Sequence, residues 1–523
     1  MSGPTQFLLP KDPAQAQPER PRNWKHFREF KGMNTASDRT SIPQDNFFYL
    51  ENLQPIGAAN AHTLPGISAA IIDYGGDTIY HRRSVNLGNT EYIILFATNG
   101  KVFAFNVQAG TSARIDGGTL LSGSNSRCDQ WKNSQILFID STGYYHWDGA
   151  TFAIITGAGV PSSGDDIAVY ANRVWIVQGR VLTISIVDDY TAAAFVVASG
   201  ASSVNLTDPT LRSKVTRLFA ANGYLYFWGI SSINVISDVR IPSGASPPAP
   251  VFTNLNIHAI VGTDQPLSVF VWGRSLMFAT RYGVYKLDGT NAVRVSADID
   301  GTWQNLDFTQ GISGGSVQLN NILCAAFCIK WNDTSPTQGP NLGLRTVLAI
   351  FFDGKWFFGN MGTAVTFIEW ALFSASPTMY GMIGNKLYKF FSDTTTHAAT
   401  IWKTALWPME DSLLDKEVFA AAIEYVSLNP SGTLTATIDS QATQATLNAT
   451  PNAAIVFINN IGGVIQFVNN LNQAINFVVS GYILNPGDAS AFGKYVGLTV
   501  QTTAGLAYQL VAAHIEYKLG PRY

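Results

Sequence analysis

The chain has 523 residues, of which 46% are apolar and only 13% are charged, with a formal net charge of −3. The apolar fraction excludes a disordered chain, and a charged fraction about half the usual ~25% excludes coiled coils and long solvated helices. The charge balance gives no overall basic surface for gripping nucleic acid. At roughly 150 residues per domain the length predicts about three domains. The 46 glycines and the 12% of aromatic residues favour short strands joined by tight turns.

The first 44 residues differ in composition from the rest of the chain. Seven basic residues outnumber four acidic ones there, and the basic ones are Lys11, Arg20, Arg22, Lys25, Arg28, Lys31 and Arg39. Four prolines within residues 10–21 favour an extended arm over a packed element. Such a composition also fits a disordered tail. We expect a docking arm over residues 1–44 that orders against an acidic partner, with Arg20, Arg22, Lys25, Arg28 and Lys31 making the contacts.

Residues 91–394 repeat one pattern. An apolar strand leads through a glycine-containing turn into a strand with a central aromatic residue, often followed by Asp-Gly. The clearest copies are residues 136–149 and 276–289, and they align Gly143 with Gly283, Tyr145 with Tyr285, and Asp148-Gly149 with Asp288-Gly289. Glycine supplies the positive φ of a tight turn, and Asp-Gly predicts a two-residue type I′ hairpin.

Weaker copies of this pattern surround the clear pair. They occupy residues 99–105, 172–184, 222–228, 351–358 and 384–390. Most spacings are ~38–52 residues, the range of four-stranded propeller blades. A single blade leaves its faces exposed, whereas a closed ring of blades buries them. The pattern predicts a β-propeller of six or seven blades over residues 45–394; a run of β-sandwiches is the alternative. An early strand within residues 67–81 is expected to close one blade.

Within residues 395–523, most of the chain carries very little charge. From residue 425 to residue 515 only Asp439, Asp488 and Lys494 are charged. Residues 464–467 and 475–478 alternate as half-buried strands, and residues 508–518 predict a final strand. The segment predicts a C-terminal antiparallel β-sandwich of jelly-roll type. A nearly neutral module of this kind suits contacts with identical copies.

The sequence predicts no catalytic, cofactor-binding or metal-binding residues. It has no GxxxxGK[ST] loop, no GxSxG elbow and no HExxH pair. Cys324 and Cys328 share one face of a strand without histidine partners, which favours small buried core residues over zinc ligands. No run reaches the ~18 apolar residues of a membrane helix, and the N-terminus lacks the apolar core of a secretory signal.

One segment resembles an enzyme feature. SADIDGTW at residues 296–303 is similar to the Asp-box turn of sialidase-type propellers, with its glycine displaced by one position. We expect a hairpin turn there. Sialidase-like catalysis needs several arginines converging on a carboxylate, and arginines are sparse in this chain.

Three motifs near the N-terminus resemble a known family. They are FKGMN at residues 30–34, IPQDNFFYLENLQPIG at residues 42–57 and TLPG at residues 63–66. They are similar to the F-x-G-hydrophobic-N start, the E-N-x-x-P-x-G segment and the Leu-Pro-Gly-like turn of tail tube-end proteins of short-tailed bacteriophages (podoviruses), called nozzle or tail hub proteins. His62 stands where such sequences often have an arginine. The match covers residues 27–70, and the propeller pattern extends it loosely to residue 394.

The resemblance implies a non-enzymatic virion protein, made in the host cytoplasm, that forms a hexameric ring below the portal and adaptor. Its central channel would carry DNA out of the capsid without sequence-specific binding, and tail fibres and a needle or tip would be neighbours. A bore without basic charge would let DNA slide, because each Lys or Arg contact to phosphate strengthens binding. Deleting residues 1–29 is expected to weaken attachment to the adaptor while the propeller stays folded.

Two other functions remain open from the residues alone. A receptor- or glycan-binding propeller on the same particle could stack sugars on Trp131, Trp147, Trp228 and Trp272. These tryptophans also lie where blade cores need bulk, which favours packing. The second alternative is a sialidase-like glycoside hydrolase.

Overall fold

The computed structural model describes residues 21–520, except for residues 57–59, 124, 334–340, 361–364, 372–376, 429–431, 441–444, 450–456, 459–463 and 466–490. The described chain is built almost entirely of β-strands. Arg20 and the strand predicted at residues 475–478 lie outside the described residues. No helix among the described residues is long and apolar enough to cross a membrane.

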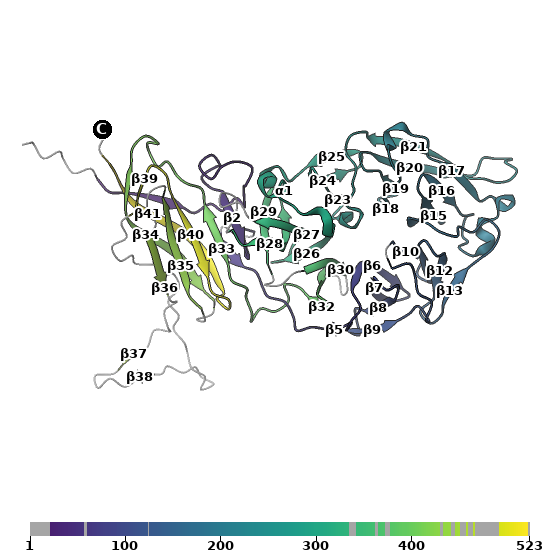
Figure 1. Ribbon diagram of the computed structural model, residues 1–523, viewed down its shortest axis with the longest axis horizontal. Helices are drawn as coiled ribbons and strands as arrows, with labels where there is room; N and C mark the ends of the chain where they lie inside the picture. The colour runs from purple at the N-terminus through teal and green to yellow at the C-terminus, as the bar shows by residue number, and fades with distance from the viewer. Residues whose placement is uncertain are drawn as a thin grey trace, which may run out of the picture.

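Seven four-stranded antiparallel units follow one another and form a ring (Figure 1). The first three consist of β6 (Ile79–Leu87), β7 (Thr90–Ala97), β8 (Val102–Asn106) and β9 (Thr111–Arg114); β10 (Arg127–Trp131), β11 (Gln135–Ile139), β12 (Tyr144–Trp147) and β13 (Phe152–Ile155); and β14 (Asp166–Tyr170), β15 (Arg173–Gln178), β16 (Val181–Ile184) and β17 (Ser202–Asn205). The next three consist of β18 (Arg217–Ala221), β19 (Tyr224–Trp228), β20 (Ile233–Arg240) and β21 (Val251–His258); β22 (Phe270–Trp272), β23 (Ser275–Thr280), β24 (Gly283–Asp288) and β25 (Asn291–Arg294); and β26 (Ser313–Leu319), β27 (Ile322–Asp333), β28 (Gly343–Phe352) and β29 (Lys355–Gly359).

The seventh unit joins the two ends of the ring. It contains β30 (Val365–Ala371), β31 (Thr378–Ile383) and β32 (Lys386–Lys389), and its fourth strand is β5 (Ile72–Asp73) from the start of the propeller. Ile72 pairs with Leu387, so the early strand expected within residues 67–81 closes this last blade. The prediction of an all-β chain with a β-propeller is confirmed, and the number of blades is seven.

The turns of the two clearest repeats differ from the sequence prediction. Asp288 pairs with Asn291, so the two loop residues are Gly289 and Thr290 rather than Asp-Gly. The equivalent loop in the second blade has four residues, 148–151. There the Asp148 carboxylate accepts hydrogen bonds from the backbone N–H groups of Ala150 and Thr151. The type I′ prediction is wrong at both turns for different reasons. The Asp148 side chain caps a longer loop. In the fifth blade Asp288 still belongs to the strand, where its carboxylate accepts a hydrogen bond from the Ser275 hydroxyl, and Thr290 lacks the positive φ that a type I′ turn requires.

The sixth blade continues into the C-terminal region as one nine-stranded sheet. After β29 the sheet adds β2 (Phe47–Glu51), β33 (Ile401–Thr404), β40 (Val496–Thr502), β35 (Leu434–Ser440) and β36 (Ala445–Ala449). A second, six-stranded sheet contains β3 (Leu53–Gln54), β4 (Ala61–Thr63), β41 (Tyr508–Leu519), β34 (Lys416–Ser427) and β39 (Ala491–Gly493), with β1 (Asn23–Phe27) also paired to β41. A short pair, β37 (Phe457–Ile458) and β38 (Val464–Ile465), stands apart from both. The final strand predicted at residues 508–518 is confirmed as β41.

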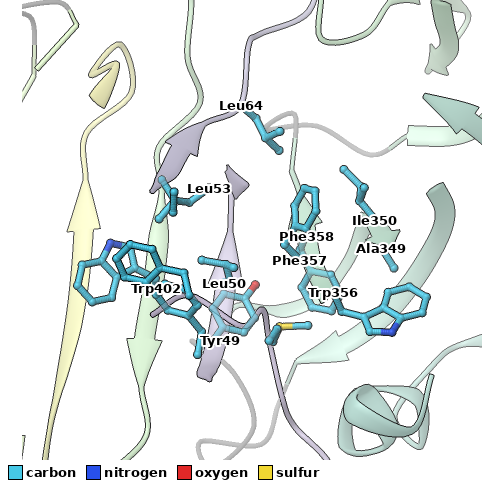
Figure 2. Close-up of a cluster of buried hydrophobic side chains, with 14 of the residues drawn as sticks. Tyr49, Leu50, Leu53, Leu64, Ala349, Ile350, Trp356, Phe357, Phe358 and Trp402 are labelled. Carbon is cyan, nitrogen blue, oxygen red and sulfur yellow. The ribbon is translucent and has the colours of Figure 1, made fainter. Parts of the chain in front are cut away.

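The core at the junction holds the propeller and the C-terminal sheets together. β2 runs parallel to β29 on one side and antiparallel to β33 on the other. Tyr49 and Leu50 of β2 are fully buried, as are Trp356 of β29 and Trp402 of β33. Figure 2 shows these side chains in one cluster. The propeller and the C-terminal sheets therefore share one hydrophobic core, and burial of its side chains stabilises both parts.

The segment at residues 296–303 is helical. A 3₁₀ turn (Ala297–Ile299) leads into α1 (Asp300–Trp303), so the expected hairpin turn is wrong. The helical turn receives the N-terminal segment, because the Thr35 N–H donates to the Asp298 carbonyl and the Gly301 N–H donates to the Thr35 carbonyl. Asp298 accepts a hydrogen bond from the Asn34 side chain, and Asp300 pairs with Arg294.

Candidate functional site

Of the basic residues predicted to dock a partner, Arg22 lies against the C-terminal sheet of its own chain. The Arg22 guanidinium lies 3.7 Å from the Glu516 carboxylate and 4.2 Å from the centre of the Phe419 ring. Lys25 donates to the Gln44 side chain at 2.6 Å, and Lys31 pairs with Asp45 at 3.0 Å. Arg28 is exposed. Lys25 lies within β1, Arg22 and Arg28 flank it, and Arg22, Lys25 and Lys31 are already paired within the chain.

The motif residues at the N-terminus form the junction described above. Gly32 has φ +91°, and a Cβ at this position would lie 3.0 Å from the Lys355 Cα. The close approach lets the Met33 N–H donate to the Trp356 carbonyl at 2.8 Å. Asn52 also links both sides, because it donates to the Ala399 carbonyl at 2.7 Å and the peptide after β29 donates to its side-chain oxygen. Gly32, Met33 and Asn52 therefore each make a contact that holds the junction together.

A buried ion cluster lies in the same junction. The Arg345 guanidinium of β28 lies 2.7 Å from the Glu51 carboxylate of β2 and 3.5 Å from that of Asp333. The Tyr49 hydroxyl donates to Glu51. Burial, together with the charge of Glu51, raises the pKa of Tyr49 well above its ordinary value. The phenol therefore stays protonated: it donates to Glu51 on its own strand and accepts a hydrogen bond from the Arg345 guanidinium, which links β2 to β28.

A pocket lies at the axis of the propeller. The first strands of neighbouring blades contact one another around this axis. The pocket between them has a volume of about 290 Å³ and is lined chiefly by His81, Arg82, Arg83, Arg217, Phe219 and Glu369. This volume is at the lower end of the range for small-ligand sites, roughly 300–1,000 Å³.

Arg82 spans the axis and joins four blades. From β6 its guanidinium donates to the carbonyls of Ile368 in the seventh blade and Gly314 in the sixth, the latter at 3.1 Å. It also reaches the Leu267 carbonyl beside the fifth blade at 3.5 Å and lies 3.5 Å from the Glu369 carboxylate. These bonds fix Arg82 as a structural tie across the ring.

Two further arginines pair with aspartates of other blades. Arg83 lies 3.3 Å from Asp129, and Arg217 lies 3.1 Å from Asp166. Each aspartate also accepts a backbone N–H from the first strand of the following blade, that of Val169 or Leu218, at 2.8 and 2.7 Å. The carboxylates of Asp129 and Asp166 therefore link neighbouring blades through ion pairs and hydrogen bonds.

Several polar atoms around this pocket have no hydrogen-bond partner. They are Nε of Arg83, Nε of Arg127, Nε of Arg217 and Nδ1 of His81. Arg127 and Arg217 are 8% and 6% exposed. No carboxylate of the described residues lies within ion-pair distance of Arg127, which donates to the Ser126 carbonyl. Burial and the surrounding positive charge of Arg127, Arg82, Arg217 and Arg83 lower the pKa of His81 well below its ordinary value. The pocket is therefore surrounded by more hydrogen-bond donors than the acceptors of the protein bind.

The sparseness of arginines in the sequence did not indicate that several would meet. Arg82 and Arg83 line the axial pocket together with Arg217, and Arg127 lies close to His81, although Arg127 and Arg217 are far along the chain from the other two. A signal was present: Arg127, Asp166 and Arg217 each occupy the first position of a blade's first strand. Aligning the repeats at these positions would have revealed the cluster.

Other residues singled out from the sequence are in the core. Trp131, Trp147 and Trp228 are at most 4% exposed, and the partly buried Trp272 donates to the Leu323 carbonyl, so packing accounts for them. Cys324 and Cys328 are free and buried, as predicted, and burial raises the pKa of both thiols to about 12. Within the described ranges, no group of three or more His, Cys, Asp or Glu side chains could hold a metal ion.

The ring of four-stranded blades makes this chain a β-propeller protein. Comparison with solved structures gives weak global likeness to the WD40 repeats of RRP9 (10% identity, TM-score 0.40, 63% of this chain and 99% of that one). It gives similar values for YCF48 bound to a D1 peptide (10%, 0.38, 64% and 99%) and for the β-propeller domain of Cps50 (Swd1) from Myceliophteria thermophila (10%, 0.37, 63% and 99%). No family model and no curated protein matches the chain.

Proposed function

We propose that this chain is the ring-forming nozzle subunit of a short bacteriophage tail. The ring would sit below the portal and adaptor, provide the channel for DNA ejection and carry attachment points for fibres and a needle or tip. The protein would act as a structural component of the virion, without catalysis.

The observation that carries this proposal is the junction built by the motif residues. Gly32, Met33, Glu51 and Asn52 carry the resemblance to nozzle proteins, and each makes a bond or close contact that joins the sixth blade to β2 or β33. A subunit in a pressurised channel wall must transmit load without bending between its domains. One continuous sheet and one shared core supply that rigidity.

The C-terminal region supports a role in self-association. We propose that residues 395–523 form a β-sandwich of jelly-roll type that contacts neighbouring subunits. Leu413, Leu428 and Phe492 expose 78%, 61% and 46% of their surface there. Leu428 and Phe492 lie in the stretch that is poor in charge, and exposed apolar side chains there favour burial against another copy.

Mass measurement and negative-stain imaging of the purified full chain test the proposal. We expect a six-fold annulus with a central opening. A monomer over the micromolar range, with no ring on particles or in solution, would contradict it.

Retention of DNA by the purified protein provides a second, independent test. A bore that lets DNA slide should retain duplex DNA weakly, with little dependence on salt. Strong DNA retention that falls steeply between 50 and 200 mM salt would argue against this function. Specific glycan binding by a protein that forms no ring would favour the receptor-binding alternative.

A further inference from the structure

We propose that the axial pocket of the propeller binds a small oxyanion ligand, a carboxylate or phosphate group held between Arg83 and Arg217 over the Phe219 ring. This site does not depend on the nozzle function. It concerns the centre of one propeller and not the channel of a ring.

The first argument is the shape and exposure of the pocket. Its volume of about 290 Å³ accommodates a molecule the size of a sugar acid or a simple phosphate ester. The Arg83 side chain is 26% exposed, whereas Arg217 is 7% exposed, so a ligand entering from solvent would meet Arg83 first and Arg217 deeper.

The second argument is the surplus of donors. A guanidinium carries five N–H groups in a planar fork and no acceptor. Of the guanidinium nitrogens of these two arginines, only Nη2 of Arg83 and Nη1 of Arg217 have a hydrogen-bond partner among the described residues. A carboxylate or phosphate offers several acceptor oxygens and matches the fork with two parallel bonds.

The third argument is that both guanidiniums are held in place without a ligand. The Phe219 ring lies 5.0 Å from the Arg83 guanidinium and 5.6 Å from that of Arg217. The aspartates hold each arginine from one end. A site that is preorganised in this way binds at a smaller entropic cost.

The charges around the pocket set the chemistry. Glu91 and Glu369 also line it, so the pocket is not simply cationic. Arg82 is tied to Glu369, and Ser84 donates to Glu91 at 3.1 Å. This distribution favours one oxyanion group on a ligand whose remainder is neutral and hydroxyl-bearing, because hydroxyls can donate to the glutamates.

Titration of the full chain with sodium acetate, inorganic phosphate and glucuronate, followed by calorimetry and thermal shift at constant ionic strength, tests the proposal. We expect saturable binding of at least one probe. Tighter binding of glucuronate than of acetate, by tenfold or more, would identify a sugar acid as the ligand source. Equal affinity would identify a free anion. Absence of saturable binding by all three probes would overturn the proposal and leave a water-filled pocket.

Variants locate the site. Arg83→Gln should weaken binding at least tenfold, and Arg281→Gln, which removes an exposed arginine paired with Asp264, should not. If Arg83→Gln fails to fold, the double variant Arg83→Gln/Asp129→Asn removes the ion pair without leaving a lone buried charge, and it should lose binding equally. Unchanged affinity in a folded Arg83 variant would overturn the placement.

Discussion

The guanidinium of Arg345, in the sixth blade, lies 2.7 Å from the carboxylate of Glu51, in the strand that links this blade to the C-terminal sheets. The two side chains are 11% and 3% exposed. Their pairing lies between two parts of the chain almost 300 residues apart and holds the propeller to the rest of the molecule.

Replacing Glu51 with alanine should therefore destabilise the whole chain. The substitution leaves Arg345 buried with only the more distant Asp333, and breaking a buried pair costs about 3–5 kcal/mol. Urea unfolding followed by tryptophan fluorescence measures the loss. The exposed pair of Arg281 and Asp264 provides the control, because Asp264→Ala should cost less than about 1 kcal/mol. Equal costs for the two substitutions would contradict the role of the buried pair.

The glycine of the FKGMN motif should be irreplaceable for reasons of space. At Gly32 both the positive φ of +91° and contacts at 3.0 Å with Lys355 and Trp356 oppose a Cβ. Gly75 also has a positive φ, +63°, but no atom lies within 4 Å of its added Cβ. We expect Gly75→Ala to cost about 1 kcal/mol from backbone conformation alone.

Gly32→Ala should lower the free energy of unfolding by at least about 2 kcal/mol. The added Cβ pushes the segment at residue 32 away from that at residues 355–356, and this cost adds to the same backbone penalty. Denaturant midpoints of the two variants measure the difference. Identical midpoints would show that the approach of residues 32 and 355 is unimportant for stability.

Truncation of the N-terminus should show a sharp boundary between Arg20 and Asn23. β1 pairs with β41, and Phe27 is 2% exposed and packs edge-on against Phe47 at 5.1 Å. Deleting residues 1–29 should cost about 4 kcal/mol, the typical loss for removal of a buried phenylalanine. The assay of adaptor attachment is therefore better made with residues 1–20 deleted, which retains β1.

Thermal unfolding and co-sedimentation with adaptor rings distinguish the two effects. The shorter deletion should leave the midpoint unchanged and weaken attachment. Normal attachment by this variant would show that the first 20 residues make no docking contact.

The buried imidazole of His81 should make stability depend on pH. Burial and the nearby arginines keep its folded-state pKa well below the value of about 6.5 expected in the unfolded chain. Between these two values the unfolded state binds a proton that the folded state does not. The free energy of unfolding should therefore fall as pH drops below about 6.5, by up to about 1.4 kcal/mol per pH unit.

Comparing the pH dependence of wild type and His81→Leu isolates this contribution from that of the carboxylates. The variant should lose less stability between pH 6.5 and pH 5. Parallel curves would show that His81 titrates in the same way in both states.

The sequence by itself determined the local architecture of the propeller. Hairpin strands depend on contacts between residues close in the chain, so the patterns around Gly143 and Gly283 were enough to predict repeated blades. It also placed Cys324, Cys328, Trp131, Trp147 and Trp228 in cores, because apolar periodicity reports burial directly. Even so, it predicted the wrong turn at Asp148, since an aspartate that caps a turn with its side chain and one at the centre of a turn look alike in sequence.

The tertiary structure alone decided what the ring brings together. Ile72 closes the last blade, 315 residues before its partner Leu387, and the register of such a closure has no local signal. Arg83, Arg127 and Arg217 lie on three different blades, so the sequence alone does not show that they meet. Only the closing of the ring points the first strands of the blades toward one axis and gathers these charges into a pocket.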